Sequence, residues 1–244
     1  MPSTPLEPIS DRFDGPGSEE YRRHDELAIA QGGSYSHYAA ILRQLTANSA
    51  RPLRVLEIGC GTGRYFHCLA NVETLVGIDN APEMLRQAQD PIRKSEITAK
   101  TIQLECADVG SYEPGQSRFD LIYSIGVLGE YCPFDATLVA RFAGMLAPGG
   151  TLFSTAVDSA SRISPPTFGK ASLQLRAMRK IFKHLPHAAR VGLNRRLSPF
   201  YVSRADIDRA FSASNMTLLQ VSPYVHPTGW QGTHWDILAG APES

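Results

Sequence analysis

The chain has 244 residues, with 24 basic and 24 acidic side chains, and is 43% hydrophobic, which is typical of a globular protein that buries one main core. Its first residues are polar and proline-rich, and no apolar run is long enough to cross a membrane, so we expect a cytoplasmic protein without a transmembrane segment. The zero net charge makes nucleic acid an unlikely partner, and the scattered spacing of the four cysteines argues against a disulfide scaffold and against a metal site.

Residues 1–48 are expected to form a loose arm followed by a helical cap, with helices at Glu19–Gln31 and Tyr35–Leu45. In residues 49–158, short apolar strands alternate with segments of helical composition, which predicts a parallel sheet covered on both faces. The strands are expected at Arg54–Ile58, Thr74–Ile78, Ile102–Cys106, Phe119–Ile125 and Thr151–Val157, and the helices at Gly63–Ala70, Pro82–Gln89 and Phe134–Leu146.

Residues 159–203 interrupt this rhythm with a basic, proline-broken insertion. Between Ser159 and Ala205 there are ten Lys or Arg and no Asp or Glu. Within this insertion, the pattern of Lys170–Leu185 predicts an amphipathic helix with one cationic face. Residues 204–244 then predict a helix at Arg204–Ser214 and two closing strands, Thr217–Val225 and His234–Ala239.

The most informative segment is the strand and turn VLEIGCGTGRYF, residues 55–66. Gly59, Gly61 and Gly63 permit a sharp turn that brings backbone N–H groups close to a ligand at the start of the next helix, where an anionic group is favoured. A dinucleotide site would have its third glycine where this chain has Arg64, so the spacing is unfavourable for a nicotinamide-dependent oxidoreductase. A purely structural glycine turn is the remaining alternative.

An acidic residue, Asp79, follows 20 residues after Gly59, at the end of the second expected strand. A carboxylate in this place accepts hydrogen bonds from both hydroxyls of a ribose. Asn80 is next to it, in position to reach an adenine. Capping of the helix that begins at Pro82 is the alternative interpretation of Asp79, and it is compatible with ribose binding.

These motifs, with Glu57 two residues before the first glycine, resemble those of the class I S-adenosylmethionine-dependent methyltransferases. The resemblance runs in register from about residue 54 to 157. It implies a Rossmann-like, doubly wound, mostly parallel seven-stranded sheet with a reversed last strand and a helical insertion between strands five and six. It also implies a cofactor site with the residues Glu57, Gly59, Gly61, Gly63, Asp79, Asn80, Asp108, Val109, Ser124, Ile125 and Gly126, closed over by Tyr38 or Tyr35 of the N-terminal helix.

The resemblance therefore implies an enzyme that moves a methyl group from S-adenosylmethionine to an oxygen or nitrogen of a small molecule. A non-catalytic S-adenosylmethionine-binding module is an alternative, and the oxidoreductase is a weaker one. The family members that methylate base amines carry an Asn/Asp-Pro-Pro-aromatic motif after strand four. Here Ser124, Ile125 and Gly126 stand in its place, which argues against such acceptors.

Three residues are candidates for a general base. Glu130 follows strand four, where many relatives have a histidine that faces the substrate, although a surface or helix-capping acid is the alternative. His226 and His234 belong to the terminal hairpin, where a structural role is the alternative.

The basic insertion, residues 159–203, is expected to form a lid over the acceptor site. Its cationic face fits an anionic or carrier-bound acceptor or a phospholipid surface, and a solvated helix face is the alternative.

Overall fold

The computed structural model describes residues 13, 16–161, 185–186, 188–189, 191–192, 200–225 and 233–243. Its strands form one sheet of seven in the order β3-β2-β1-β4-β5-β7-β6. Strand β7 runs antiparallel to both of its neighbours. The expected seven-stranded α/β fold with a reversed last strand is thus confirmed. The chain divides into two compact units, residues 1–123 and 124–244.

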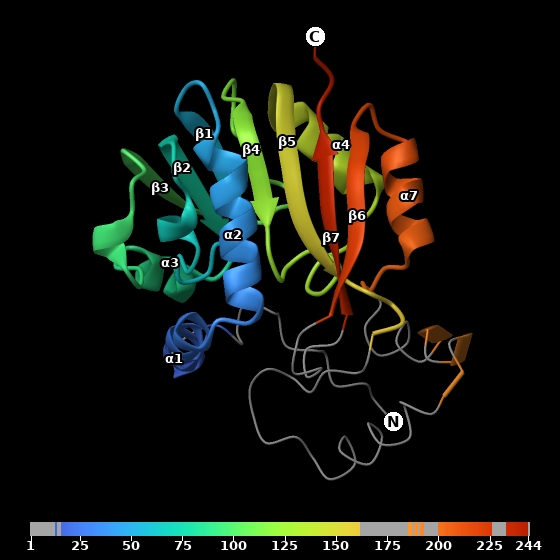
Figure 1. Ribbon diagram of the computed structural model, residues 1–244, viewed down its shortest axis with the longest axis horizontal. Coiled ribbons are helices and arrows are strands. Elements are labelled where there is room, and N and C mark those ends of the chain that lie inside the picture. Colours follow the sequence, from blue (N-terminus) through green and yellow to red (C-terminus); the bar gives the residue numbers. More distant parts are fainter. Residues whose placement is uncertain are drawn as a thin grey trace. The chain divides into compact units, whose positions relative to one another are not determined.

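The first unit contains the N-terminal helices and four strands of the sheet. Figure 1 shows β3, β2, β1 and β4 side by side, and each pair of neighbours among them is parallel. The elements are α1 (Pro16–Gln31), α2 (Ser34–Ala47), β1 (Leu53–Ile58), η2 (Phe66–Cys68), β2 (Val72–Asp79), α3 (Pro82–Ala88), η3 (Lys94–Glu96), β3 (Thr101–Cys106) and β4 (Phe119–Ser124).

The apolar side chains of the central strands form the core of this unit. Val55 and Leu56 of β1 and Leu75 of β2 are completely buried. The edge strand β3 differs, because all its residues except Leu104 are exposed. The expectation that the sheet is covered on both faces is therefore wrong for β3, which has a strand on one side only.

The helix expected at Gly63–Ala70 is also wrong. The chain forms only a 3₁₀ turn, η2, and returns to an extended conformation at Leu69. Gly63 has a φ of 76°, in the left-handed region that interrupts a right-handed helix. The ring of Phe66 packs so close to Gly63 that an added Cβ would lie 2.7 Å from it. These two residues close the turn before a helix can begin.

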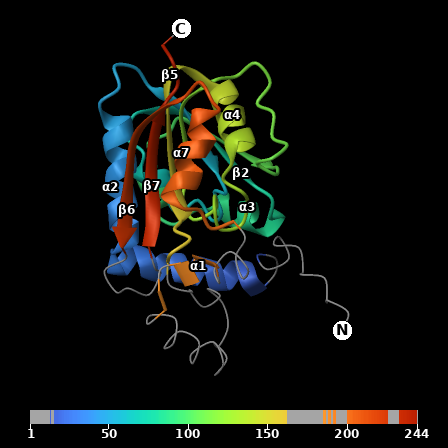
Figure 2. The same cartoon turned by 90° about the vertical axis from the view of Figure 1, so that its right-hand side faces the viewer.

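The second unit contains α4 (Ala136–Met145), β5 (Leu146–Val157), α7 (Arg204–Ser212), β6 (Thr217–Val225) and β7 (Thr233–Gly240). The helices α4 and α7 lie beside each other (Figure 2), and the rings of Phe134 and Phe211 are 6.0 Å apart. The N-caps define both helix starts. Asp135 accepts from the Leu138 amide, and Ser203 forms a reciprocal capping box with Asp206.

The expected amphipathic helix of the insertion lies outside the described residues, apart from Leu185 at its end. Among the residues that are described, no helix is both long and apolar enough to span a membrane.

Candidate functional site

The carboxyl ends of the first unit's strands lie at one edge of the sheet, because β3, β2, β1 and β4 are parallel. Gly59 follows β1, and Asp79 is the last residue of β2. Asp108 lies two residues beyond β3, and Ser124 is the last residue of β4. Ligands of open α/β sheets bind at such an edge.

Asp79 connects the glycine turn to the end of β2. Its Oδ2 atom accepts a hydrogen bond from the Gly61 N–H at 2.9 Å, and its Oδ1 atom accepts one from the Ala81 N–H at 2.9 Å. Burial raises the pKa of the half-buried Asp79 carboxyl, and these amide hydrogen bonds oppose the shift. The N-cap position of α3 is occupied by Ala81, and no side-chain capping hydrogen bond is formed there. Asp79 is therefore not the cap of that helix.

Three further amides of the turn also have protein acceptors. The N–H groups of Gly59 and Cys60 both donate to the Ile78 carbonyl, at 2.8 and 3.0 Å, and that of Gly63 donates to the Cys60 carbonyl. The expected helix N-terminus is therefore absent, and the amides of Gly59, Cys60 and Gly63 hold the turn together. The glycines instead provide positive φ angles and a close approach of the backbone.

Glu57, the acid before the first glycine, is buried with only 3% of its surface exposed. Its Oε2 atom accepts a hydrogen bond from the Tyr123 hydroxyl at 2.5 Å. Burial raises the pKa of Glu57 to about 8, and the hydrogen bond from Tyr123 opposes the shift. The carboxyl therefore holds a proton more tightly than an ordinary glutamate does.

A buried ion pair at the glycine turn was not foreseen from the sequence. Asp25 of α1 is completely buried. Its Oδ2 atom accepts from the Thr62 hydroxyl at 2.6 Å, and its Oδ1 atom accepts from Arg64 Nη1 at 2.8 Å. The sequence offers no signal that singles out Asp25, because the expected first helix contains four acids and 37 residues separate Asp25 from Thr62.

The residues expected near the adenine surround the end of β2. Asn80 and Asp108 are exposed, and Val109 is half-buried. Asp108 accepts a hydrogen bond from the Gly110 N–H at 2.7 Å, so it opens a turn after β3. Because Cys106 is the register partner of Asp79, Asp108 lies close to the end of β2 in the pairing.

The two candidate tyrosines of α2 are both buried. Tyr38 makes an edge contact with His37, with the ring centroids 5.0 Å apart. The Tyr35 hydroxyl lies 2.6 Å from His67 Nε2, and its ring stacks on Tyr65. Tyr35 thus packs against the segment that follows the glycine turn.

In the second unit, the loop after β4 begins at Ile125 and Gly126. The Gly126 N–H donates to Thr155 Oγ1 of β5 at 2.9 Å. Gly126 has a φ of 76°, and among the described residues an added Cβ would meet no atom within 4 Å. The backbone is therefore open on this side, whereas Ser124 just before it is buried.

Glu130 is the half-buried acid of the same loop. Burial raises the pKa of Glu130 to about 7, although a hydrogen bond from Tyr131 opposes the shift. His234 lies near the start of β7, paired with Val157 at the carboxyl end of β5. His226 lies outside the described residues.

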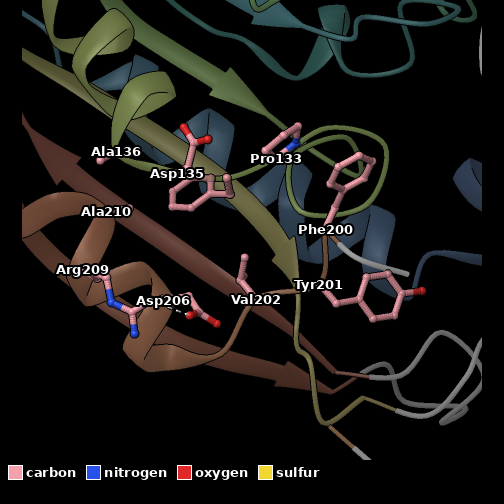
Figure 3. A pocket seen from close by; sticks show the side chains of 10 residues that line it. Pro133, Asp135, Ala136, Phe200, Tyr201, Val202, Asp206, Arg209 and Ala210 are labelled. Carbon is pink, nitrogen blue, oxygen red and sulfur yellow. Dashed lines mark hydrogen bonds and ion pairs between the residues drawn. The ribbon is translucent and has the colours of Figure 1, made fainter. Parts of the chain in front are cut away.

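A pocket of about 520 Å³ opens between the starts of α4 and α7. Its walls come from residues 133–136, residues 200–202 and the first turns of α7. Figure 3 shows Phe200 and Tyr201 on one side and Arg209 beside Asp206, an ion pair of 3.2 Å, on another. The Phe200 carbonyl lies 3.4 Å from where a Cβ on Gly129 would be, so this wall adjoins the loop that carries Glu130.

The chain is similar to known methyltransferases. Residues 55–150 match a family profile described as a methyltransferase domain. Trans-aconitate 2-methyltransferase from Methylobacterium nodulans is 29% identical over 181 residues, which are 72% of this chain and 63% of the relative. The chain thus spans less than two thirds of that relative's length.

Two solved structures share the fold over nearly the whole chain. Magnesium protoporphyrin IX methyltransferase from Synechocystis, with bound SAH, superposes with a TM-score of 0.62 at 16% identity and covers 96% of this chain and 97% of its own. The N-methyltransferase NodS from Bradyrhizobium japonicum, in complex with S-adenosyl-L-homocysteine, gives 0.58 at 18% identity and covers 91% and 98%. At 16% and 18% identity, these similarities show the fold alone.

Proposed function

We propose that this chain, a member of the class I S-adenosylmethionine-dependent methyltransferase family, binds S-adenosylmethionine and transfers its methyl group to an oxygen or nitrogen of a small molecule. The observation that carries the proposal is the bond between the Gly61 amide and Asp79, which joins the glycine turn and the acid at the end of β2 into one element. Binding of S-adenosylmethionine or SAH by relatives of the same fold supports it.

The described residues fit such a cofactor. The Asp79 oxygens accept hydrogen bonds from the amides of Gly61 and Ala81, and the Asn80 amide also stabilises the carboxylate. A carboxylate has about four acceptor sites in all, so a ribose hydroxyl can still bind. Asn80, Asp108 and Val109 lie beyond the ends of β2 and β3, in the place we assign to the adenine. A Cβ at Gly61 would be in ordinary contact with Met84 Cε at 3.4 Å and Tyr21 Cε1 at 3.8 Å, so the position favours glycine because of its φ of 55°.

We assign the methionine end of the cofactor to the glycine turn, with Glu57 beneath it, and the reacting end to Ser124, Ile125 and Gly126. The bound cofactor supplies a methyl group that a sulfonium has already activated. The protein's contribution is then to align the acceptor atom and to exclude water. The open face of Gly126 allows the cofactor or the acceptor to approach the backbone there.

Glu130 is our candidate for the general base. A base works best when its pKa lies near the working pH, and burial brings the pKa of Glu130 to about 7. In its ionised form it would take the proton of an acceptor hydroxyl or ammonium as the acceptor atom attacks the methyl group. His234 of β7, the register partner of Val157 at the carboxyl end of β5, is the second candidate, and His226 stays a prediction.

For the acceptor we propose a small organic acid or a carrier-bound acid. The relative with the name trans-aconitate 2-methyltransferase supports an acid, as does the excess of ten basic residues between Ser159 and Ala205. The pocket between α4 and α7, with Arg209 at its wall, would hold a part of the acceptor distant from the methyl group. The insertion 159–203 would close over it as a lid, and the protein would act in the cytoplasm.

The proposal is tested first by calorimetric titration with S-adenosylmethionine, SAH and NADH. We expect micromolar-range binding of the first two and none of the third. Asp79→Asn should weaken cofactor binding roughly tenfold or more, because a charged hydrogen-bond acceptor for the ribose is lost. Glu73→Gln is the matched control, since Glu73 stands at the other end of β2 and pairs only at the surface with Lys100 in the contacts described here. Cofactor binding that survives Asp79→Asn unchanged would mean that the cofactor site has been misassigned.

Methyl transfer is tested separately, with a panel of carboxylic acids, phenols and amines and the methyl-labelled cofactor. Transfer to any of the acids supports the full proposal. Tight cofactor binding without transfer to any compound of the panel would favour a non-catalytic binding module.

A further inference from the structure

We propose that Asp25 neutralises the Arg64 side chain at the glycine turn and thereby sets the turn's relative affinity for S-adenosylmethionine and its demethylated product. This inference rests on the proposed function, because it concerns the same turn. Asp25 acts through Arg64 and Thr62 and is therefore a positioning residue, not a catalytic one.

The geometry places one buried carboxylate between two residues of the turn. Asp25 has no exposed surface, and its two oxygens accept separate hydrogen bonds from Thr62, at 2.6 Å, and Arg64, at 2.8 Å. Both partners lie within the four residues from Gly61 to Arg64. A buried carboxylate in such a pairing fixes its partners, because either charge alone would be costly to bury.

Helix α1 contacts other parts of the first unit next to this turn. Arg22 Nη1 donates to the Asp90 carbonyl at 2.8 Å, just beyond the end of α3. Tyr21 approaches Gly61 from the same helix. Figure 1 shows α1 passing below the lower ends of α2 and α3. Asp25 is thus the residue through which α1 places a negative charge against the turn.

The charge on Arg64 is poorly screened by solvent. Its side chain is 18% exposed, and its guanidinium lies over the ring of Tyr65, 4.8 Å from the centroid. Without Asp25, the turn would carry an uncompensated cation, while Glu57 and Asp79 would remain as they are. Like charges repel each other strongly in such a partly desolvated place.

The two ligands differ in net charge by one unit. S-adenosylmethionine has a sulfonium, an ammonium and a carboxylate, and is a net cation, whereas the demethylated product lacks the sulfonium and is neutral overall. An uncompensated Arg64 therefore weakens binding of the first more than that of the second. A carboxylate left without Arg64 has the opposite effect.

The test is the ratio of the two dissociation constants, S-adenosylmethionine over product, measured by calorimetry at low salt. In Asp25→Asn we expect this ratio to rise roughly fivefold, the order expected for a partly screened charge. In Arg64→Gln we expect it to fall below the wild-type ratio. In the double variant, in which neither charge is present, it should return to within about twofold of the wild-type ratio. Glu26→Gln, one residue along α1 and in a 3.8 Å surface contact with Arg22, is the control and should not change this ratio.

A purely structural role would raise both dissociation constants by the same factor, leave the ratio unchanged in both single variants, and overturn the proposal. If Asp25→Asn does not fold, Arg64→Gln decides alone, and a ratio that stays constant or rises contradicts the proposal. A wild-type chain that binds neither ligand would contradict the proposed function itself, and this inference with it.

Discussion

The glycine turn of the first unit and the loop after β4 in the second unit are held in different ways. In the turn, the amides of Gly59 and Gly61 donate to residues of β2, and the Thr62 hydroxyl donates to Asp25 of α1. In the loop, the amides of Glu130 and Tyr131 donate to Val127 and that of Gly129 to Cys132, all within six residues of one another. The turn is therefore fixed by distant elements, whereas the loop is tied to β5 at Gly126 and is held by its own residues from Val127 to Cys132.

This difference corresponds to the two tasks that we propose. A cofactor that many enzymes share suits a fixed element, whereas acceptors vary from one enzyme to another and suit a locally closed loop that tolerates change. The comparison predicts that substitutions in the turn change stability and cofactor affinity, and that substitutions in the loop change the reaction.

The largest effect is expected from Glu130→Gln, which tests whether the loop carries the reaction. Loss of the general base should lower kcat about 100-fold or more, because proton transfer by a positioned base contributes that much. In the wild type, kcat should rise with pH through about 7, where the Glu130 carboxyl becomes ionised, and in the variant this rise should disappear. The affinity for S-adenosylmethionine should not change. A kcat within threefold of the wild type would assign the base elsewhere, with His234 as the next candidate.

A pair of alanine substitutions compares the turn and the loop directly, since Gly63 and Gly126 have the same φ of 76°. Gly126→Ala should cost about 1 kcal/mol of unfolding free energy for the left-handed backbone alone. Gly63→Ala should cost about 3 kcal/mol, because its Cβ would also lie 2.7 Å from the Phe66 ring. Denaturant unfolding of both variants measures the difference, and equal costs would remove the contrast between the two regions.

A smaller effect concerns the acid beneath the turn. The pKa of Glu57 is raised from its ordinary value to about 8, so the folded protein holds a proton that the unfolded chain has lost. Stability should therefore fall as the pH rises from about 4.5 to about 8, and change no further above that. Glu57→Gln removes this titration, so the stability of the variant relative to the wild type should rise steadily between pH 5 and pH 8. Glu73→Gln, an exposed acid of β2, should follow the wild-type pH profile. A Glu57→Gln profile parallel to that of the wild type would show that Glu57 is ionised in the fold.

Most of the fold could be predicted from local patterns. The strand Thr217–Val225 is confirmed with the same bounds, and β1, β3 and β4 agree to within one residue. Each of these has an apolar pattern that its own residues make visible. The helix expected after Gly63 was wrong, because the ring of Phe66 and the left-handed φ of Gly63 decide the conformation there. Neither of these can be predicted from the helical composition of the segment.

Less of the candidate site could be predicted from the sequence. Gly61 and Asp79 follow two strands that such a sheet places side by side, so the motif spacing was sufficient to predict that the turn and the acid lie at the same edge of the sheet, although not their hydrogen bond. The contacts of Asp25 with Thr62 and of Glu57 with Tyr123 join residues 37 and 66 positions apart, and depend on how a helix and a fourth strand pack. No local pattern encodes such contacts.

The double anchoring of Asp79 has a consequence for the kinetics of binding. Amides of Gly61 and Ala81 hold the carboxylate from two sides before any ligand arrives, so no rotamer needs to be frozen in the encounter. Association should then be limited by diffusion and orientation, and differences in affinity among cofactor analogues should lie almost entirely in their rates of release.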